Sequence, residues 1–251
     1  MSARFNRPKR LARIATSPLS AETKRALSQA ERRLGIDVGV PIGEGTAWIA
    51  GDTDEVDYFT LYGALIDRHF PADVSDTAVL DIGAHKGYYA LRCFADGARR
   101  VDSYEPASQN LESLRRSAAT MENWNLHAAA VGAEAGTIEL HLSPGSWGHS
   151  VHVPVGGESV GSEVVEMVSL SSALDNVSAE GLPVVAKINV EGAAGSMILG
   201  TVAQDWSAVR LLWADVEEND PIGLEEISAH LALVGLDHVE RDGHRNRFIR
   251  R

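Results

Sequence analysis

The residues best suited to chemistry lie in a glycine turn, within the stretch AVLDIGAHKGYYAL at positions 78–91. Gly83 and Gly87 allow positive φ and close approach of a ligand to the backbone, and the helix expected next offers free N–H groups to an anion. A dinucleotide site needs G-x-G-x-x-G, whereas this turn is D-x-G-x-x-x-G and His85 would crowd a pyrophosphate. Asp81, at the strand end, is placed to meet an ammonium group. The pattern favours an amino-acid-bearing cofactor, S-adenosylmethionine, with a purely structural tight turn as the alternative.

A second chemical position is Glu105, which ends the apolar run RVDSYEP and is followed by Pro106. It lies 22 residues after Gly83. An acid at about this distance, at the end of the second strand, accepts hydrogen bonds from ribose hydroxyls. We therefore expect Glu105 to bind the ribose of the cofactor; a solvated strand-end carboxylate is the alternative.

A third stretch, KINVEG at positions 187–192, places Lys187 inside an apolar run and Glu191 at its carboxyl end. Ligands of open α/β sheets bind at the carboxyl ends of the strands, so Glu191 should face the reacting centre. Because a buried lysine is costly without a partner, a structural Lys187–Glu191 ion pair is the competing interpretation.

Methyl transfer to a hydroxyl group requires a proton acceptor, and three side chains qualify. Glu191 is the first candidate, His149 in the Gly/Ser-rich stretch SPGSWGHSVH is the second, and His85 is the third. His149 and His152 have the spacing of a metal pair, but no third ligand is evident, and we expect no metal site.

The elements that must position these residues alternate from Thr77 onward between short apolar runs and helical patterns. This alternation predicts an α/β fold with a doubly wound, mainly parallel sheet. The ending HVERDGHRNRFIRR predicts a hairpin around Asp242-Gly243, and hence an antiparallel C-terminal strand. We also expect WNLHAAAVG to form a third strand and Ser108 to cap the helix after Pro106. Residues 143–166 should form a long excursion with short strands, and AAGSMILGTVAQDW at 193–206 should be helical.

The N-terminal part is expected to be an extension of the main domain. A surface helix should begin at Ser20, loop or short strands should follow over VGVPIGEGTAWIAGDTD at 38–54, and a helix should cover EVDYFTLYGALIDRHF. The predicted division is a basic tail and helix at 1–35, a lead-in at 36–76 and a cofactor-binding domain at 77–251.

Composition limits the possible partners. The chain has 251 residues and a net charge of −12, but residues 1–33 carry nine Lys/Arg against two acids (+7) and the remainder fourteen against thirty-three (−19). An acidic body argues against nucleic-acid binding, and the basic end leaves contact with an anionic partner open. With one cysteine, Cys93, no intrachain disulfide forms, and no apolar run approaches the ~20 residues that span a bilayer. We expect a cytoplasmic protein.

Together the three stretches resemble the FkbM family of S-adenosylmethionine-dependent methyltransferases. The family pattern is D-x-G-A-N-x-G, then E-P, then K-x-D-x-E-G followed shortly by another Glu, and the resemblance covers about residues 77–235. It implies the class I methyltransferase fold, with a mainly parallel seven-stranded sheet and an antiparallel C-terminal strand, and methylation of hydroxyl groups on small natural products, sugars or glycolipids. His85 stands at the family's Asn, Asn189 at its Asp, and Ala194 where the second acid often occurs.

The sequence therefore predicts an S-adenosylmethionine-dependent O-methyltransferase acting on a small hydroxylated acceptor. The departures at Asn189 and Ala194 keep a non-catalytic cofactor-binding relative as an alternative, and an NAD-dependent oxidoreductase and a nucleic-acid methyltransferase are further alternatives. Glu191 and His149 are the predicted catalytic residues. The predicted cofactor contacts are Asp81, Gly83, Ala84, His85, Gly87, Glu105 and Asn189.

Overall fold

The structure is a computed structural model that describes residues 7–31, 36–50, 55–152, 159–218 and 220–251. Its helices are α1 (Arg7–Thr16), α2 (Ala21–Ala30), α3 (Glu55–Leu65), α4 (Tyr88–Ala95), α5 (Ser108–Ala118), α6 (Leu170–Ser178), α7 (Ala194–Leu199) and α8 (Leu224–Leu233). Within these ranges, none of the helices has the length and apolar character needed to cross a membrane.

A seven-stranded sheet forms the centre of the molecule, in the order β11-β12-β10-β9-β3-β4-β5. Its strands are β3 (Ala78–Ile82), β4 (Arg100–Tyr104), β5 (Trp124–His127), β9 (Val184–Ile188), β10 (Val209–Asp215), β11 (Leu236–Asp242) and β12 (Arg245–Arg250). The predicted doubly wound, mainly parallel sheet is confirmed, because β12 runs antiparallel to both β10 and β11 while β9, β3, β4 and β5 pair in parallel.

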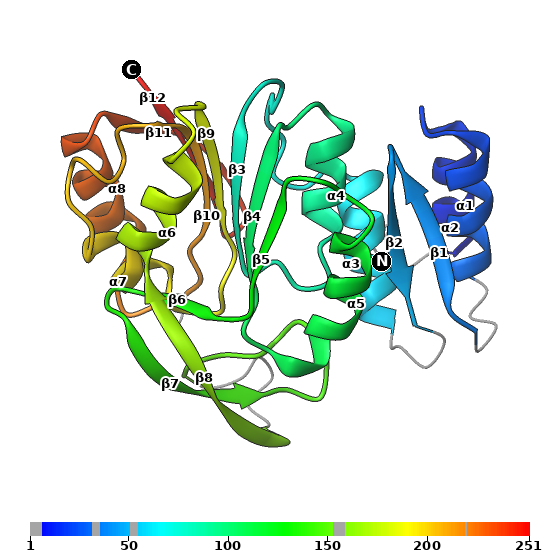
Figure 1. The fold of residues 1–251 in the computed structure, drawn as a ribbon, viewed down its shortest axis with the longest axis horizontal. Helices are drawn as coiled ribbons and strands as arrows, with labels where there is room; N and C mark the ends of the chain where they lie inside the picture. Colours follow the sequence, from blue (N-terminus) through cyan, green and yellow to red (C-terminus); the bar gives the residue numbers. More distant parts are fainter. Residues whose placement is uncertain (1–6, 32–35, 51–54, 153–158, 219) are drawn as a thin grey trace.

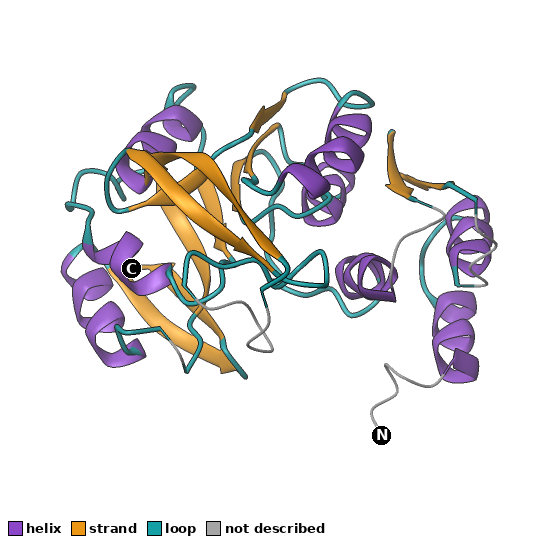
Figure 2. Ribbon diagram, turned by 90° about the horizontal axis from the view of Figure 1, so that it is seen from below, coloured by secondary structure: helices purple, strands orange, loops and turns teal. Residues whose placement is uncertain are grey.

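Alternate residues of the central strands enter two separate apolar cores. Val79, Val101 and Val185 pack with α3 and α4 on one face, whereas Leu80 and Ala186 pack with α6, α7 and α8 on the other. This follows from the two-residue period of side chains along a strand. Figure 1 shows the resulting layers, with α6–α8 on one side of the sheet and α3–α5 on the other, and Figure 2 shows the sheet between the two groups.

The N-terminal elements extend the α3–α5 side of the molecule. Strands β1 (Val38–Ile42) and β2 (Gly45–Ile49) form an antiparallel hairpin that packs on α4 and α5, and α2 packs on β1. The helix predicted to begin at Ser20 is present, and the Ser20 side chain accepts a hydrogen bond from the Thr23 N–H. Residues of α2, the hairpin and α3 share one apolar core with β3 and β4.

A smaller sheet, in the order β6-β8-β7, changes the predicted layout of the middle of the chain. It consists of β6 (Ala130–Gly132), β7 (Gly136–Leu142) and β8 (Gly161–Ser169). The prediction of one strand over WNLHAAAVG was wrong, since β5 belongs to the main sheet and β6 to this one. A nine-residue strand, β8, also begins within the predicted 143–166 excursion, of which residues 153–158 lie outside the described ranges.

Two helix predictions require correction. Ser108 is not the N-cap of α5, because Ala107 holds that position and the helix begins at Ser108. The Ser108 N–H instead donates to Glu163 Oε1 at 2.9 Å, so a distant carboxylate satisfies the helix end. The helix predicted over residues 193–206 is limited to α7 at Ala194–Leu199.

Candidate functional site

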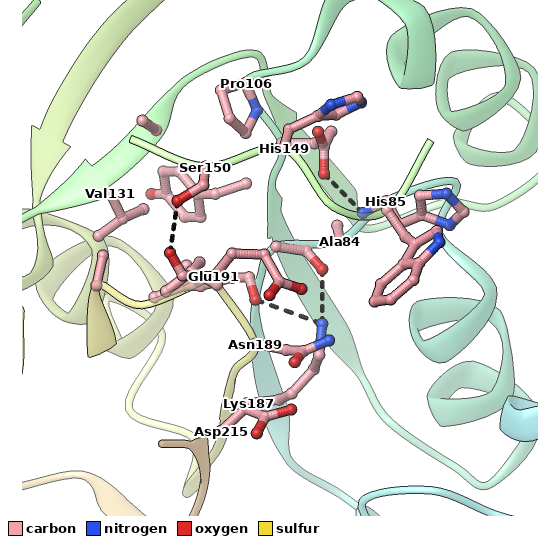
Figure 3. A pocket seen from close by; sticks show the side chains of 18 of the residues that line it. Ala84, His85, Pro106, Val131, His149, Ser150, Lys187, Asn189, Glu191 and Asp215 are labelled. Carbon is pink, nitrogen blue, oxygen red and sulfur yellow. Dashed lines mark hydrogen bonds between the residues drawn. The ribbon is translucent and has the colours of Figure 1, made fainter. Parts of the chain in front are cut away.

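A cavity of about 980 Å³ lies between the carboxyl ends of the parallel strands and the small sheet. Its walls include residues that follow four neighbouring strands, namely Gly83 after β3, Glu105 after β4, Glu191 after β9 and Asp215 at the end of β10. Figure 3 shows side chains from these segments around one space. The volume is at the upper end of the range for ligand sites in proteins, and the location is the ligand-binding edge of open α/β sheets.

The glycines of the turn have different physical roles. Gly83 has φ +72°, and a Cβ there would lie 2.0 Å from the carbonyl oxygen of Asn189, so only glycine fits where the turn meets β9. Gly87 has φ +82°, and its Cβ would meet Leu114 Cδ1 and Trp124 at 2.6 Å. Gly87 is therefore required for packing against α5 and β5. Gly83 and Ala84 both line the cavity, whereas Gly87 is not among the lining residues.

Asp81 is paired inside the protein. Lys187 Nζ lies 2.7 Å from Asp81 Oδ1 and also donates to the carbonyl oxygen of Gly83 at 2.7 Å. Both side chains are buried, and Asp81 does not line the cavity. Asp81, predicted to meet a cofactor ammonium, has the Lys187 ammonium as its partner here, and Lys187 pairs with Asp81 rather than with Glu191. The pair fixes the start of the turn relative to β9.

Glu105 is buried at the cavity wall and is held by its own chain. Its Oε2 accepts from the His85 N–H at 2.8 Å, and its Oε1 accepts from the Ala107 N–H at 3.0 Å and from Asn110 Nδ2 at 3.2 Å. Burial raises the pKa of Glu105 to about 7, although the three hydrogen-bond donors act to lower it. Since each carboxylate oxygen accepts two hydrogen bonds, Oε2 retains capacity for a ligand hydroxyl.

His85 adopts φ +55° and turns its ring toward the 143–150 segment. Its Nε2 lies 3.0 Å from Ser146 Oγ and 3.4 Å from Asp57 Oδ1, and Ser146 Oγ donates to Asp57 Oδ1 at 2.9 Å. Burial, together with the nearby cations Lys86 and Lys187, lowers the pKa of His85 well below its usual value. A neutral His85 therefore ties the turn to α3 and to the 143–150 segment.

His149 lines the cavity, but protein partners occupy both of its ring nitrogens. Its Nδ1 accepts from the Ser143 N–H at 3.0 Å, and its Nε2 contacts the amide of Gln109. Burial lowers the pKa of His149. Because Nδ1 accepts from the Ser143 N–H and Nε2 faces the side chain of Gln109, neither ring nitrogen is turned to the cavity for the predicted role of base.

Glu191 belongs to a group of carboxyl side chains at the ends of β9 and β10. Glu191, Asp215 and Glu217 line the cavity, and the backbone of Glu191 accepts from Ser150 Oγ at 2.9 Å (Figure 3). Burial and the adjacent Glu217 raise the pKa of Glu191 to about 9, and burial with Glu217 also raises that of Asp215. Glu191 therefore carries its proton at neutral pH, contrary to what a general base requires.

Several lining residues were not singled out from the sequence. Asp215 and Glu217 stand in LLWADVEEND at a strand end, which is the same signal that selected Glu191. Asn110, which lines the cavity, and Asp57, which contacts His85 and Ser146 behind it, carried no such signal, because each lies in a helix. Asn189 lines the cavity, and its N–H donates to the Ile82 carbonyl oxygen at 3.1 Å. In the part of the chain that the structure describes, no group of three or more His, Cys, Asp or Glu is placed to hold a metal ion.

The strand order, with a reversed β12 between β10 and β11, defines the class I methyltransferase fold. Solved structures similar to this chain include Aeropyrum pernix fibrillarin in complex with natively bound S-adenosyl-L-methionine, at 12% identity, with 76% of this chain and 74% of that chain covered and a TM-score of 0.43. A Methanococcus jannaschii fibrillarin pre-rRNA processing protein is 9% identical over 85% and 88%, with a TM-score of 0.42. A putative RNA methyltransferase from Pyrococcus horikoshii is 10% identical over 77% and 85%, with a TM-score of 0.40.

These likenesses are loose, and the fold assignment comes from the strand order itself. No family model matches the chain, and no curated protein matches it either.

Proposed function

We propose that this protein is an S-adenosylmethionine-dependent methyltransferase that methylates a hydroxyl group of a small molecule, as the FkbM resemblance implies. The observation that carries the proposal is the meeting of the Gly83 turn, Glu105 and Asn189 in one cavity at the carboxyl edge of a class I methyltransferase sheet. The acidic body of the chain favours a small acceptor over a nucleic acid.

The polar atoms of the cavity wall fit such a cofactor. Buried side-chain atoms without a hydrogen-bond partner include Asn110 Oδ1, His85 Nδ1, Glu191 Oε2 and Asp215 Oδ1, and all four residues line the cavity. Unpaired buried polar atoms are costly, and a ligand rich in hydroxyl and amino donors would satisfy acceptors of this kind. Gly83, Ala84 and His85 of the turn, with Glu105 and Asn189, are the residues proposed to hold the cofactor.

When bound, the cofactor would supply a methyl group on a sulfonium, which is already a good leaving group. The contribution of the protein is then chiefly positioning. Glu105 would accept from ribose hydroxyls, and the Asp81–Lys187 pair would hold the turn against β9. Glu191 would accept the proton of the acceptor only toward alkaline pH, because its pKa is raised to about 9.

A cofactor titration tests the proposal directly. We expect S-adenosylmethionine and S-adenosylhomocysteine to bind in isothermal titration calorimetry, and Glu105→Ala to weaken both by at least about tenfold. Glu112→Gln, which changes an exposed acid on α5, is the matched control and should leave both affinities unchanged. Absence of binding by folded wild-type protein at millimolar ligand would exclude the proposal, and a titration with NAD would test the oxidoreductase alternative.

A non-catalytic cofactor-binding protein is the second candidate function. Two observations favour it. Glu191 keeps its proton at neutral pH, and Asn189 and Ala194 stand where the FkbM pattern has acids. Such a protein would bind S-adenosylmethionine yet release no S-adenosylhomocysteine with hydroxylated acceptors between pH 7 and 9.5. An enzyme should show turnover that rises with pH toward about 9, and Glu191→Gln should remove that rise.

A further inference from the structure

We propose that the acceptor is a planar aromatic ring that carries a hydroxyl group, that is, a phenol. This inference rests on the proposed function and adds the chemical class of the substrate. It comes from the composition of the cavity wall, which changes from one side to the other.

The wall beside the small sheet is formed by small and aliphatic side chains. Ala129, Val131, Ile138, Leu140 and Met167 line this side, which is continuous with Pro106 next to Glu105. A ribose bound by Glu105 would direct the adenine here. In Figure 3, Val131 on this side and His85 lie at opposite sides of the cavity.

The opposite wall is aromatic. Phe59 of α3, Phe70, Tyr88 and Tyr89 of α4 and Trp147 of the 143–150 segment all line the cavity. Phe70 lies edge-to-face with Tyr89, with ring centroids 6.1 Å apart, and Tyr88 lies edge-to-face with His85 at 6.0 Å. Tyr104 also lines the cavity, but its ring stacks on the ring of His127. Aromatic walls of this kind favour a flat ring that stacks or meets them edge-on.

Trp147 is the most informative of these residues, because hydrogen bonds hold the adjacent Ser146 while the Trp147 side chain remains partly exposed. Ser146 contacts Asp57 and His85 through Oγ, and its carbonyl oxygen accepts from Asn110 Nδ2 at 2.9 Å. Trp147 nevertheless remains 50% exposed while it lines the cavity. A large aromatic side chain that follows a fixed residue and is half-exposed at a ligand cavity is suited to stack on a bound ring.

The acidity of the hydroxyl group is a second reason for a phenol. The charged groups at this end have both signs: Lys187 Nζ lies 5.8 Å and 5.7 Å from the centroids of the Phe70 and Tyr89 rings and is paired with Asp81, and Arg245 Cζ lies 5.2 Å from the centroid of Phe70. A phenolic O–H ionises near pH ~10, far below the ~15.7 of water. Because Glu191 keeps its proton at neutral pH, an acceptor that loses its own proton readily matches the site better than an aliphatic alcohol.

The proposal is tested by acceptor binding to the protein saturated with S-adenosylhomocysteine. The probes are 2-naphthol and catechol, against cyclohexanol and methyl glucoside as non-aromatic alcohols, in calorimetry with tryptophan fluorescence as a second readout. We expect the phenols to bind at least about tenfold more tightly than the alcohols. Trp147→Ala should weaken phenol binding about tenfold, and Trp147→Phe should restore most of it, with unchanged affinity for S-adenosylhomocysteine.

Val164→Ala is the matched control, because Val164 is an exposed apolar residue of β8 outside the cavity wall, and it should change neither affinity. Equal or tighter binding of methyl glucoside, or no phenol binding by protein that binds S-adenosylhomocysteine, would overturn the acceptor assignment alone. Failure to bind S-adenosylhomocysteine would overturn the proposed function and the acceptor assignment with it.

Discussion

Replacing Glu191 by Gln removes a carboxyl group whose protonation differs between the folded and unfolded chain. The pKa of Glu191 rises from an ordinary 4.5 to about 9 because burial and the neighbouring Glu217 oppose its charge. Between pH 5 and pH 8 the unfolded chain has released this proton and the folded chain keeps it. The free energy of unfolding of the wild type should therefore fall as pH rises, and Gln, which cannot ionise, should not contribute to that fall.

The size of the effect follows from the pH interval. One pKa unit corresponds to ~1.36 kcal/mol, so three pH units give an upper limit of about 4 kcal/mol. Because the Glu191 side chain is only partly buried, solvent screening reduces this limit, and we expect about 2 kcal/mol. For a chain of this length that corresponds to a shift in Tm of roughly 4–8 °C.

The assay is a series of thermal unfolding measurements at pH 5, 6, 7 and 8. The Tm of Glu191→Gln minus that of the wild type should increase steadily over the series. Glu112→Gln, at an exposed position on α5, should give a difference that does not change with pH. If the Glu191→Gln difference were also constant, Glu191 would be ionised in the folded protein, and the objection to its action as a base at neutral pH would disappear.

Three further substitutions probe the elements that hold the turn. Gly83→Ala places a Cβ 2.0 Å from the Asn189 carbonyl oxygen at φ +72°, and should lower the free energy of unfolding by about 2 kcal/mol or more in chemical denaturation. Lys187→Met leaves Asp81 buried without its partner and should cost about 3–5 kcal/mol, whereas the double variant with Asp81→Asn should recover part of this loss. Glu105, with a pKa of about 7, should bind S-adenosylmethionine more tightly at pH 8 than at pH 6, and a Glu105→Gln variant whose affinity still followed pH would contradict its role.

Local patterns in the sequence were sufficient to predict the sheet and the turn. The apolar runs that form β3, β4, β9 and β10 are each bounded by a glycine, a proline or an acid, and the turn signal at Asp242-Gly243 gave the reversed last strand. The run Ala128–Gly132 was misassigned because apolar periodicity does not distinguish one strand from two that enter different sheets.

The partners of the predicted site residues were harder to predict, because they depend on contacts between distant segments. Asp81 and Lys187 are 106 positions apart, yet they are direct register partners in the neighbouring parallel strands β3 and β9. Once those strands are adjacent, the two side chains project from the same face and the ion pair follows. The Asp57–Ser146–His85 contacts had no such precursor, since α3 and the 143–150 segment meet the turn only in the folded chain.

The carboxyl groups of the cavity give a physical reading of the departures from the family pattern. Asn189 and Ala194 stand where the FkbM pattern that the chain resembles has acids, but Asp215 at the end of β10 and Glu217 just after it place two acids at the same cavity. Together with burial, these two acids raise the pKa of Glu191 to about 9. A further carboxylate at Asn189 would have to be compensated by another bound proton or a cation. The neutral side chain at 189 is thus consistent with a site whose negative charge is supplied by the acids at the end of β10.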